Sequence, residues 1–183
     1  MKTRKKTKNK REQREKLIHI ALFAVSALFL FSPLLFAFKL GEFKSFGLLG
    51  IGILNFVSSA SLFFPAPGIV ATGIGGAHFN PLLVALFSAS GSAMGESVAF
   101  AFGYSSTKLT NSEKHILSIF TKLFHHKHTT LLIFLFAFVP NPFFDVMGIL
   151  AGVSHYSLRR FLFIVFAARF MRDTIVAFIG SQV

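Results

Sequence analysis

The chain of 183 residues has no cysteine, and only seven acidic residues stand against 19 lysines and arginines. Without cysteine it can form neither a disulfide framework nor a thiolate metal site. It also lacks a P-loop or other nucleotide motif, so we expect no ATP-driven activity. The histidines of "HHKH", His125, His126 and His128, have no carboxylate partner and are expected to be solvated. We therefore predict no metal and no cofactor.

Apolar residues dominate what is present. They make up 53% of the chain, 26 of them are phenylalanines, and the mean hydropathy is +0.64. A soluble domain of this size cannot bury so much apolar surface in one core. Three runs approach the roughly 20 apolar residues that cross a bilayer: Leu17 to Phe38, Phe46 to Phe64 and Phe161 to Ile179. We predict an all-α, multi-pass integral membrane protein.

The net charge of +12 is concentrated at the N-terminus. Nine of the 19 basic residues precede Leu17, in a tail over residues 1–16. A basic cluster before a spanning helix indicates a cytoplasmic anchor attracted to anionic head groups, and nucleic-acid binding is the less favoured alternative. No small-x-small cleavage site closes the apolar run before Lys39, so we expect residues 17–45 to hold a retained first transmembrane helix and a connector.

Two interruptions divide the remaining domain, residues 46–183. Both "FFPAPGIVATGIGGAHFNP" and "FAFVPNPFFDVMGILAGVSHY" place proline and glycine in apolar surroundings. Broken backbone cannot face lipid, and the arm Leu131 to Val139 is too short to span, so we predict re-entrant hairpins near residues 63–80 and 131–153. The residues expected to shape the hairpins are Pro65, Pro67, Gly73 and Gly76 in the first, and Pro140, Pro142, Gly148 and Gly152 in the second.

The two interruptions also match one another. Each leads into a long apolar helix, Leu82 to Tyr104 or Ser157 to Gly180. The pattern predicts an inverted repeat of one unit, a re-entrant hairpin plus a transmembrane helix. In the simplest register Glu96 falls opposite Arg172, and two units of opposite orientation would bring these charges toward a shared cavity. The alternative is coincidence, since proline and glycine cluster in many membrane loops.

These residues carry a family resemblance. "FVPNPFFDVMGILAG" followed by "RFLFIVFAARFMRDT" resembles the signature half of the VTT domain of the DedA and SNARE-associated Golgi protein superfamily. "FPAPGIVATGIGGAHFN" and then "GSAMGESVAFAFGYSSTK" is similar to that family's Pro-Gly hairpin and small-residue helix. The resemblance covers about Phe46 to Gly180 and implies movement of phospholipid or polyprenyl-phosphate lipids between leaflets. Val139 and Ile69 stand where typical bacterial members carry charge, which argues against carrying over their proton-coupled chemistry.

Charged residues at membrane depth are the main site candidates. Asp145 follows the second break, where it can hold a head-group amine, a proton or an arginine, or cap the next helix. Arg169 and Arg172 share one helix face and suit phosphate binding, with snorkelling as the alternative. A local pair between Arg169 and Asp173 is sterically natural, and Glu96 completes the proposed polar track.

Asn141, beside the prolines of the second hairpin, can offer its amide to a head group, although a turn role is favoured. The expected function is a lipid transporter or scramblase without ATP, with membrane lipids of anionic or phosphorylated head group as partners. Two alternatives remain: a membrane-shaping or assembly protein without transport, and an ion-coupled small-solute transporter. We expect no enzymatic activity, because no motif fixes the spacing of Ser90 and Ser92 relative to His155.

Overall fold

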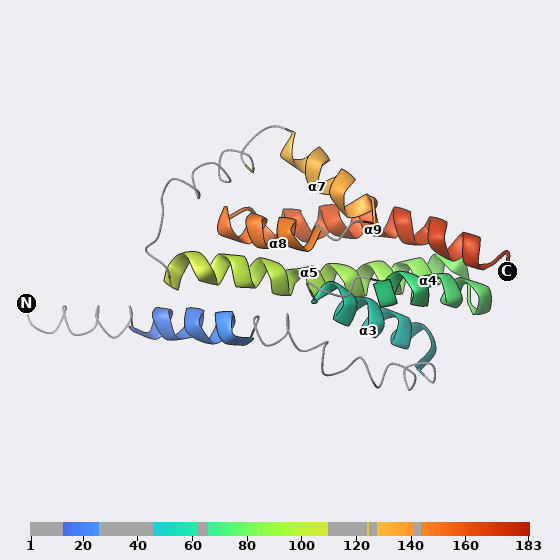
Figure 1. The fold of residues 1–183 in the computed structure, drawn as a ribbon, viewed down its shortest axis with the longest axis horizontal. Coiled ribbons are helices and arrows are strands. Elements are labelled where there is room, and N and C mark those ends of the chain that lie inside the picture. Colours follow the sequence, from blue (N-terminus) through green and yellow to red (C-terminus); the bar gives the residue numbers. More distant parts are fainter. Residues whose placement is uncertain (1–12, 26–45, 62–65, 110–123, 125–127, 141–143) are drawn as a thin grey trace, which may run out of the picture.

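A computed structural model describes residues 13–25, 46–61, 66–109, 124, 128–140 and 144–183. Every regular element within these ranges is a helix, which confirms the all-helical class (Figure 1). After a helix over residues 13–25, the order is α3 (Gly47–Ser59), α4 (Ala66–His78), α5 (Pro81–Leu109), α7 (Thr129–Phe138), α8 (Phe144–Val153) and α9 (Leu158–Gly180).

The helices fall into two length classes. α3 and α4 have 13 residues each and α7 and α8 have 10 each, so at about 1.5 Å per residue none extends beyond about 20 Å. α5 and α9 have 29 and 23 residues. Among the described residues, Pro81–Thr107 is the one helix that is long and apolar enough to cross a membrane. α9 is long enough, but five of its residues are charged.

The breaks between helices follow from local chemistry. Val139 is extended before Pro140, because a residue preceding proline is pushed out of the helical region, and α7 ends there. α8 ends at Val153, and His155, two residues later, has a φ of 52°, which places it in the left-handed region. The amides of His155 and Tyr156 donate to the carbonyls of Gly152 and Ala151, closing a Schellman turn before α9.

α5 and α9 form an antiparallel central pair, seen side by side in Figure 1. Each is covered by two short helices. α3 packs on α5 and α7 packs on α9, the long helix that follows each in the chain, whereas α4 packs on α9 and α8 packs on α5. Each pair of short helices therefore bridges both long helices.

Glycines let the crossed helices approach closely. A Cβ at Gly76 in α4 would overlap the carbonyl of Ala177 in α9, and one at Gly152 in α8 would overlap the carbonyl of Phe100 in α5. The long helices contribute the reciprocal positions, Gly180 against the carbonyl of Gly73 and Gly103 against that of Ile149. Small residues with close backbone contact are typical of helix packing in membranes.

The main apolar core lies beside α7 and α8. It includes Ile133, Phe144 and Ala151 from these helices, with Phe161 and Val165 from α9. The second core cluster is much smaller and consists of buried Ile51, Val84 and Ala177, with Leu48 against them. The interior around α3 and α4 is therefore filled largely by polar side chains, such as Asn55 and Thr72.

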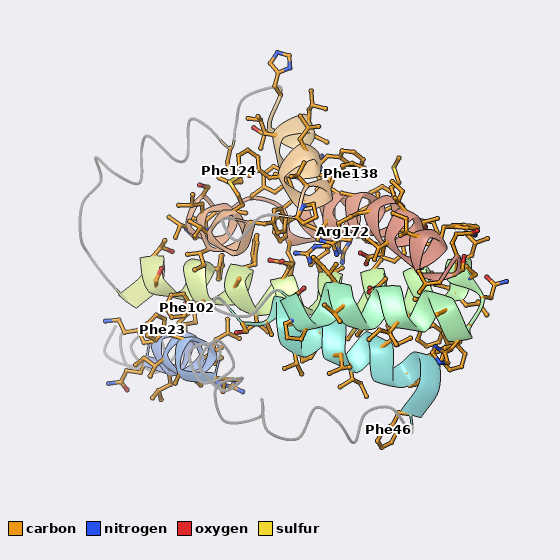
Figure 2. All side chains as sticks on the ribbon, turned by 45° about the vertical axis from the view of Figure 1, so that its right-hand side comes forward. Phe23, Phe46, Phe102, Phe124, Phe138 and Arg172 are labelled. Carbon is orange, nitrogen blue, oxygen red and sulfur yellow. The ribbon has the colours of Figure 1, made fainter. Side chains whose placement is uncertain are left out.

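The helix over residues 13–25 lies against the second half of α5. Phe23 and Phe102 lie next to one another (Figure 2) and stack with ring centroids 4.7 Å apart. The ring centroids of His19 and Tyr104 are 5.7 Å apart. The helix coincides with the start of the run predicted as helical from Leu17 to Phe38. The rest of that run and the first part of the basic tail lie outside the described residues.

Candidate functional site

Four charged side chains are buried at the crossing of the two long helices. Glu96 of α5 and Asp173 of α9 are fully buried, and Arg169 and Arg172 of α9 are 8% and 6% exposed. Among the side chains whose burial the structure describes, no other charged one is buried. Taking charge out of water costs several kcal/mol per ion unless it is paired, so the pairing decides whether this cluster is stable.

Arg169 connects α9 with the helices around it. Its Nη2 donates to Oε1 of Glu96 at 2.5 Å, and its Nη1 donates to the hydroxyl of Ser59 in α3 at 3.2 Å. The guanidinium also lies over the ring of Phe144 in α8, 5.2 Å from its centroid. Its Nε is buried and has no hydrogen-bond partner among the described residues. One donor of this arginine is therefore unused.

Arg172 and Asp173 form the second ion pair within α9. Nε and Nη2 of Arg172 both donate to Oδ1 of Asp173, at 2.8 and 2.6 Å. Oδ2 of Asp173 accepts the hydroxyl of Ser88 in α5 at 2.7 Å. Asp173 therefore links Arg172 to α5.

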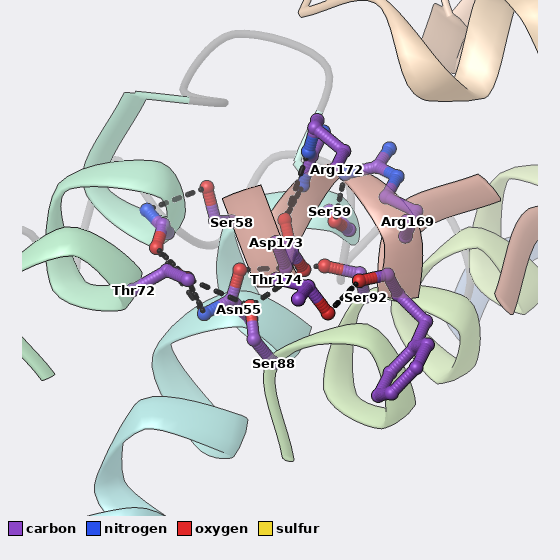
Figure 3. Close-up of polar contacts among 12 residues, drawn as sticks. Asn55, Ser58, Ser59, Thr72, Ser88, Ser92, Arg169, Arg172, Asp173 and Thr174 are labelled. Carbon is purple, nitrogen blue, oxygen red and sulfur yellow. Dashed lines mark hydrogen bonds and ion pairs between the residues drawn. The ribbon is translucent and has the colours of Figure 1, made fainter. Parts of the chain in front are cut away.

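A chain of uncharged polar groups extends from Asp173 into the first pair of short helices (Figure 3). The hydroxyl of Ser88 lies 2.7 Å from that of Thr72 in α4, and Thr72 donates to the carbonyl of Gly68 at 2.9 Å. Nδ2 of Asn55 in α3 donates to the carbonyl of Gly68 at 3.2 Å, and Oδ1 of Asn55 accepts from Ser92 at 3.3 Å. Hydroxyls and an amide fill the interior here in place of apolar side chains.

The structure brings four predicted residues together but corrects their pairing. Glu96 pairs with Arg169, although the sequence register placed it opposite Arg172. The carboxylate of Asp173 accepts from Arg172 and not, as predicted, from Arg169. The cause is the antiparallel crossing, which sets Glu96 level with Arg169 and Ser88 level with Asp173.

The structure does not place the other predicted residues in the charge cluster. Asn141, Pro142 and Pro65 fall outside the described residues. Asp145 belongs to the first turn of α8, and its role stays a prediction. The serine–histidine alternative is not assembled: Ser90 donates to the carbonyl of Leu86, and His155 contacts Thr107.

Sequence reasoning did not include the uncharged polar residues of α3, α4 and α5 in the site. A signal was present in α5 and in α3. Ser88, Ser92 and Glu96 recur every fourth residue and so share one face of α5. The apolar run of α3 holds a polar group at the same spacing, Asn55, Ser58 and Ser59, all of which are buried.

The charges of the cluster cancel. Two guanidinium groups face two carboxylates at 2.5 and 2.6 Å, in an interior where water cannot screen them. Such a cluster can exchange an internal partner for a charged group of a ligand. Within the described residues, no group of three or more His, Cys, Asp or Glu side chains gathers that could hold a metal ion.

Comparison with known proteins gives one match. The family model described as the VTT domain matches residues 65–182, well over half of the chain. The matched region includes all four buried charges. No curated protein and no solved structure matches the chain.

Proposed function

The chain belongs to the VTT domain family, and from this premise we propose that it is a multi-pass membrane protein that moves a phosphorylated lipid between the two leaflets without ATP. The main support for this proposal is the buried cluster of two arginines and two carboxylates between α5 and α9. Ionisable groups at membrane depth are expensive and mark transport pathways by default. A membrane-shaping or assembly protein without transport does not require such buried charges.

The proposed architecture is an inverted repeat of α3–α4–α5 and α7–α8–α9, with each short pair as a re-entrant hairpin. The short helices, the antiparallel long helices and the crossed packing all support it. The glycine contacts supply a register: they match Gly103 with Gly180 and Phe100 with Ala177. This register makes Glu96 equivalent to Asp173, one residue away from the match that the sequence suggested.

In the proposed mechanism the arginines hold the lipid phosphate. Guanidinium groups bind phosphate through paired N–H donors, and the Nε of Arg169 is available for this. Glu96 and Asp173 balance the arginines when no lipid is bound, while the acyl chains stay in hydrocarbon. Asp145 and Asn141 are proposed to contact the head group from the second hairpin. The basic tail keeps the N-terminus on the cytoplasmic side. No bond is made or broken, so the activity is transport and not enzymatic.

The test is lipid transfer in liposomes that contain the purified protein. Labelled phospholipid in the inner leaflet becomes accessible to a membrane-impermeant reductant only if it crosses. We expect faster bleaching than in empty liposomes, and a large loss of rate in Arg172→Ala and in Glu96→Gln. The matched control is Ser105→Ala, because Ser105 is buried in α5 and its hydroxyl has no hydrogen-bond partner among the described residues.

Protein that transfers no lipid faster than empty liposomes, for several head groups and with or without a pH gradient, would remove transport and leave an assembly role. Normal transfer in both charge variants would move the function away from the cluster. Each variant must elute as a single species in detergent, so that loss of rate is separated from loss of fold.

A further inference from the structure

The charge balance of the cluster bears on which lipid the site accepts. Among the described side chains, the buried charges are two arginines and two carboxylates, which sum to zero. Building on the proposed function, we propose that the site selects zwitterionic head groups, which carry a phosphate and an ammonium together. Such a head group adds no net charge to a buried site, whereas an anionic lipid adds one uncompensated negative charge.

The pair between Arg169 and Glu96 is the one that opens to admit the head group. Its partners come from different helices, α9 and α5, and one contact at 2.5 Å joins them. Arg172 and Asp173 are neighbours in one helix, joined by two hydrogen bonds, and Ser88 holds the second oxygen of Asp173. Separation of the long helices therefore breaks the first pair and leaves the second intact.

The phosphate takes the place of Glu96 on Arg169. The Nε of Arg169 is buried without a hydrogen-bond partner among the described residues, and Ser59 holds its Nη1. A phosphate oxygen at Nε and another at Nη2 would form the bidentate contact that a guanidinium favours. Binding thus satisfies a donor that is unsatisfied when the ion pair is closed.

The ammonium takes the place of Arg169 on Glu96. A carboxylate released in a dry interior needs a new positive partner, because an unpaired buried charge is strongly disfavoured. Two aromatic rings lie near this position: Phe144 stacks on Phe161 with centroids 6.4 Å apart, and a Cβ at Gly148 would lie 3.2 Å from Oε2 of Glu96 and 3.7 Å from Phe161. Aromatic faces attract ammonium groups.

An anionic head group cannot complete this exchange. It supplies a phosphate for Arg169 but no cation for Glu96, so three negative charges, the phosphate, Glu96 and Asp173, share a site with two arginines. We expect transfer of phosphatidylethanolamine and phosphatidylcholine to exceed that of phosphatidylglycerol by about tenfold, equivalent to about 1.4 kcal/mol.

Glu96→Gln removes or reverses the expected order. The amide removes one negative charge, so the closed site carries a net positive charge and an anionic head group restores neutrality. The ratio of zwitterionic to anionic transfer falls by about tenfold or more in this variant. Glu96→Asp keeps the charge and keeps the wild-type order. Ser105→Ala, a buried change on the same helix, leaves the ratio unaltered.

The experiment measures transfer of the three lipids, labelled on matched acyl chains, in liposomes with wild-type protein, Glu96→Gln, Glu96→Asp or Ser105→Ala. Equal wild-type rates, faster phosphatidylglycerol, or an unchanged ratio in Glu96→Gln would overturn the selectivity while the proposed function stands. No transfer of any lipid by the wild type would overturn both. If Glu96→Gln does not fold, the wild-type order and its retention in Glu96→Asp decide.

Discussion

The two pairs of short helices pack alike but differ in what they bury. α4 lies on α9 as α8 lies on α5, and glycines close both contacts. The α3–α4 pair buries Asn55 and Thr72, whereas the α7–α8 pair buries Ile133 and Phe144. The two pairs therefore share a packing geometry but differ in chemistry. Hydrogen bonds next to the charge cluster hold the α3–α4 pair, and close-packed aromatic rings hold the α7–α8 pair.

We therefore expect the α3–α4 side and the α7–α8 side to have different roles. Apolar packing is non-directional but responds steeply to lost volume, whereas a hydrogen-bonded interior can exchange its partners for water or for polar ligand groups. Under the proposed function, the α3–α4 side supplies hydrogen-bonding partners to a head group that α8 also contacts. The α7–α8 side is suited to keep the long helices in place. Four predictions test this comparison.

The largest effect is expected at Arg169, which contacts both pairs through Ser59 and Phe144. Arg169→Met leaves Glu96 buried without its counter-charge and should lower the free energy of unfolding in detergent by about 3 to 5 kcal/mol. The double variant Glu96→Gln with Arg169→Met should recover most of the loss. A loss below about 1 kcal/mol, typical of an exposed pair, would contradict the buried ion pair.

Loss of volume in the apolar half should come next. Phe161 is fully buried and contacts Phe100 and Phe144. Phe161→Ala removes a ring from a packed interior and should cost about 3 to 5 kcal/mol of unfolding free energy, by thermal denaturation in detergent. Phe161→Leu should cost much less. Similar stability of Phe161→Ala and wild type would mean that the α7–α8 side is not close-packed.

The packing shared by both halves can be tested with single methyl groups. Gly76→Ala and Gly152→Ala each force a Cβ onto a backbone carbonyl and should destabilise by about 1 to 3 kcal/mol. Gly73→Ala is the matched control on α4, since its Cβ would only touch Val176 at 3.8 Å. Equal melting temperatures for Gly76→Ala and Gly73→Ala would refute the close crossing of α4 and α9.

The smallest effect is expected in the hydrogen-bonded half. Thr72→Val keeps the shape but removes the hydroxyl between Gly68 and Ser88, which should cost about 0.5 to 1.5 kcal/mol. Thr174→Val is the control, because that hydroxyl bonds the carbonyl of Phe170 in its own helix. If the two valine variants unfold at the same denaturant concentration, the polar chain does not stabilise the α3–α4 side.

Hydropathy and the Pro/Gly breaks were sufficient to predict the two long helices, whereas the run from Phe46 to Phe64, expected to approach a full span, holds α3 with only 13 residues. The segment expected from Leu82 to Tyr104 is α5, Pro81–Leu109, and the one from Ser157 to Gly180 is α9, Leu158–Gly180. Composition alone also singled out the four charges, because a charge in an apolar helix must be sheltered. These predictions depend only on the residues of one segment and on whether that segment lies in water or in lipid, and both can be judged from the segment alone.

The pairing of the charges depends on contacts between distant segments, and the structure shows neither a direct pair of Glu96 with Arg172 nor the local pair of Arg169 with Asp173 among its ion pairs between described residues. Which arginine faces Glu96 is set by how far α5 slides along α9, and that is fixed where Gly103 and Gly180 meet backbone of α8 and α4. A shift of one residue moves a helical side chain by about 100°, so counting along the sequence could not decide it. The roles of Asp145 and Asn141 stay predictions.

The most direct test of the central claim is the reach of water-soluble thiol reagents to single cysteines in this cysteine-free chain. Ser59 and Ala137 are buried alike, 5% and 1% exposed, but lie on the polar and apolar sides. We predict that a charged methanethiosulfonate labels Ser59→Cys in liposomes, that phospholipid with a short acyl chain slows labelling, and that Ala137→Cys is not labelled. Transfer by Ser59→Cys that continues while its thiol stays unmodified, or equal labelling at both positions, would contradict a head-group path through the charge cluster.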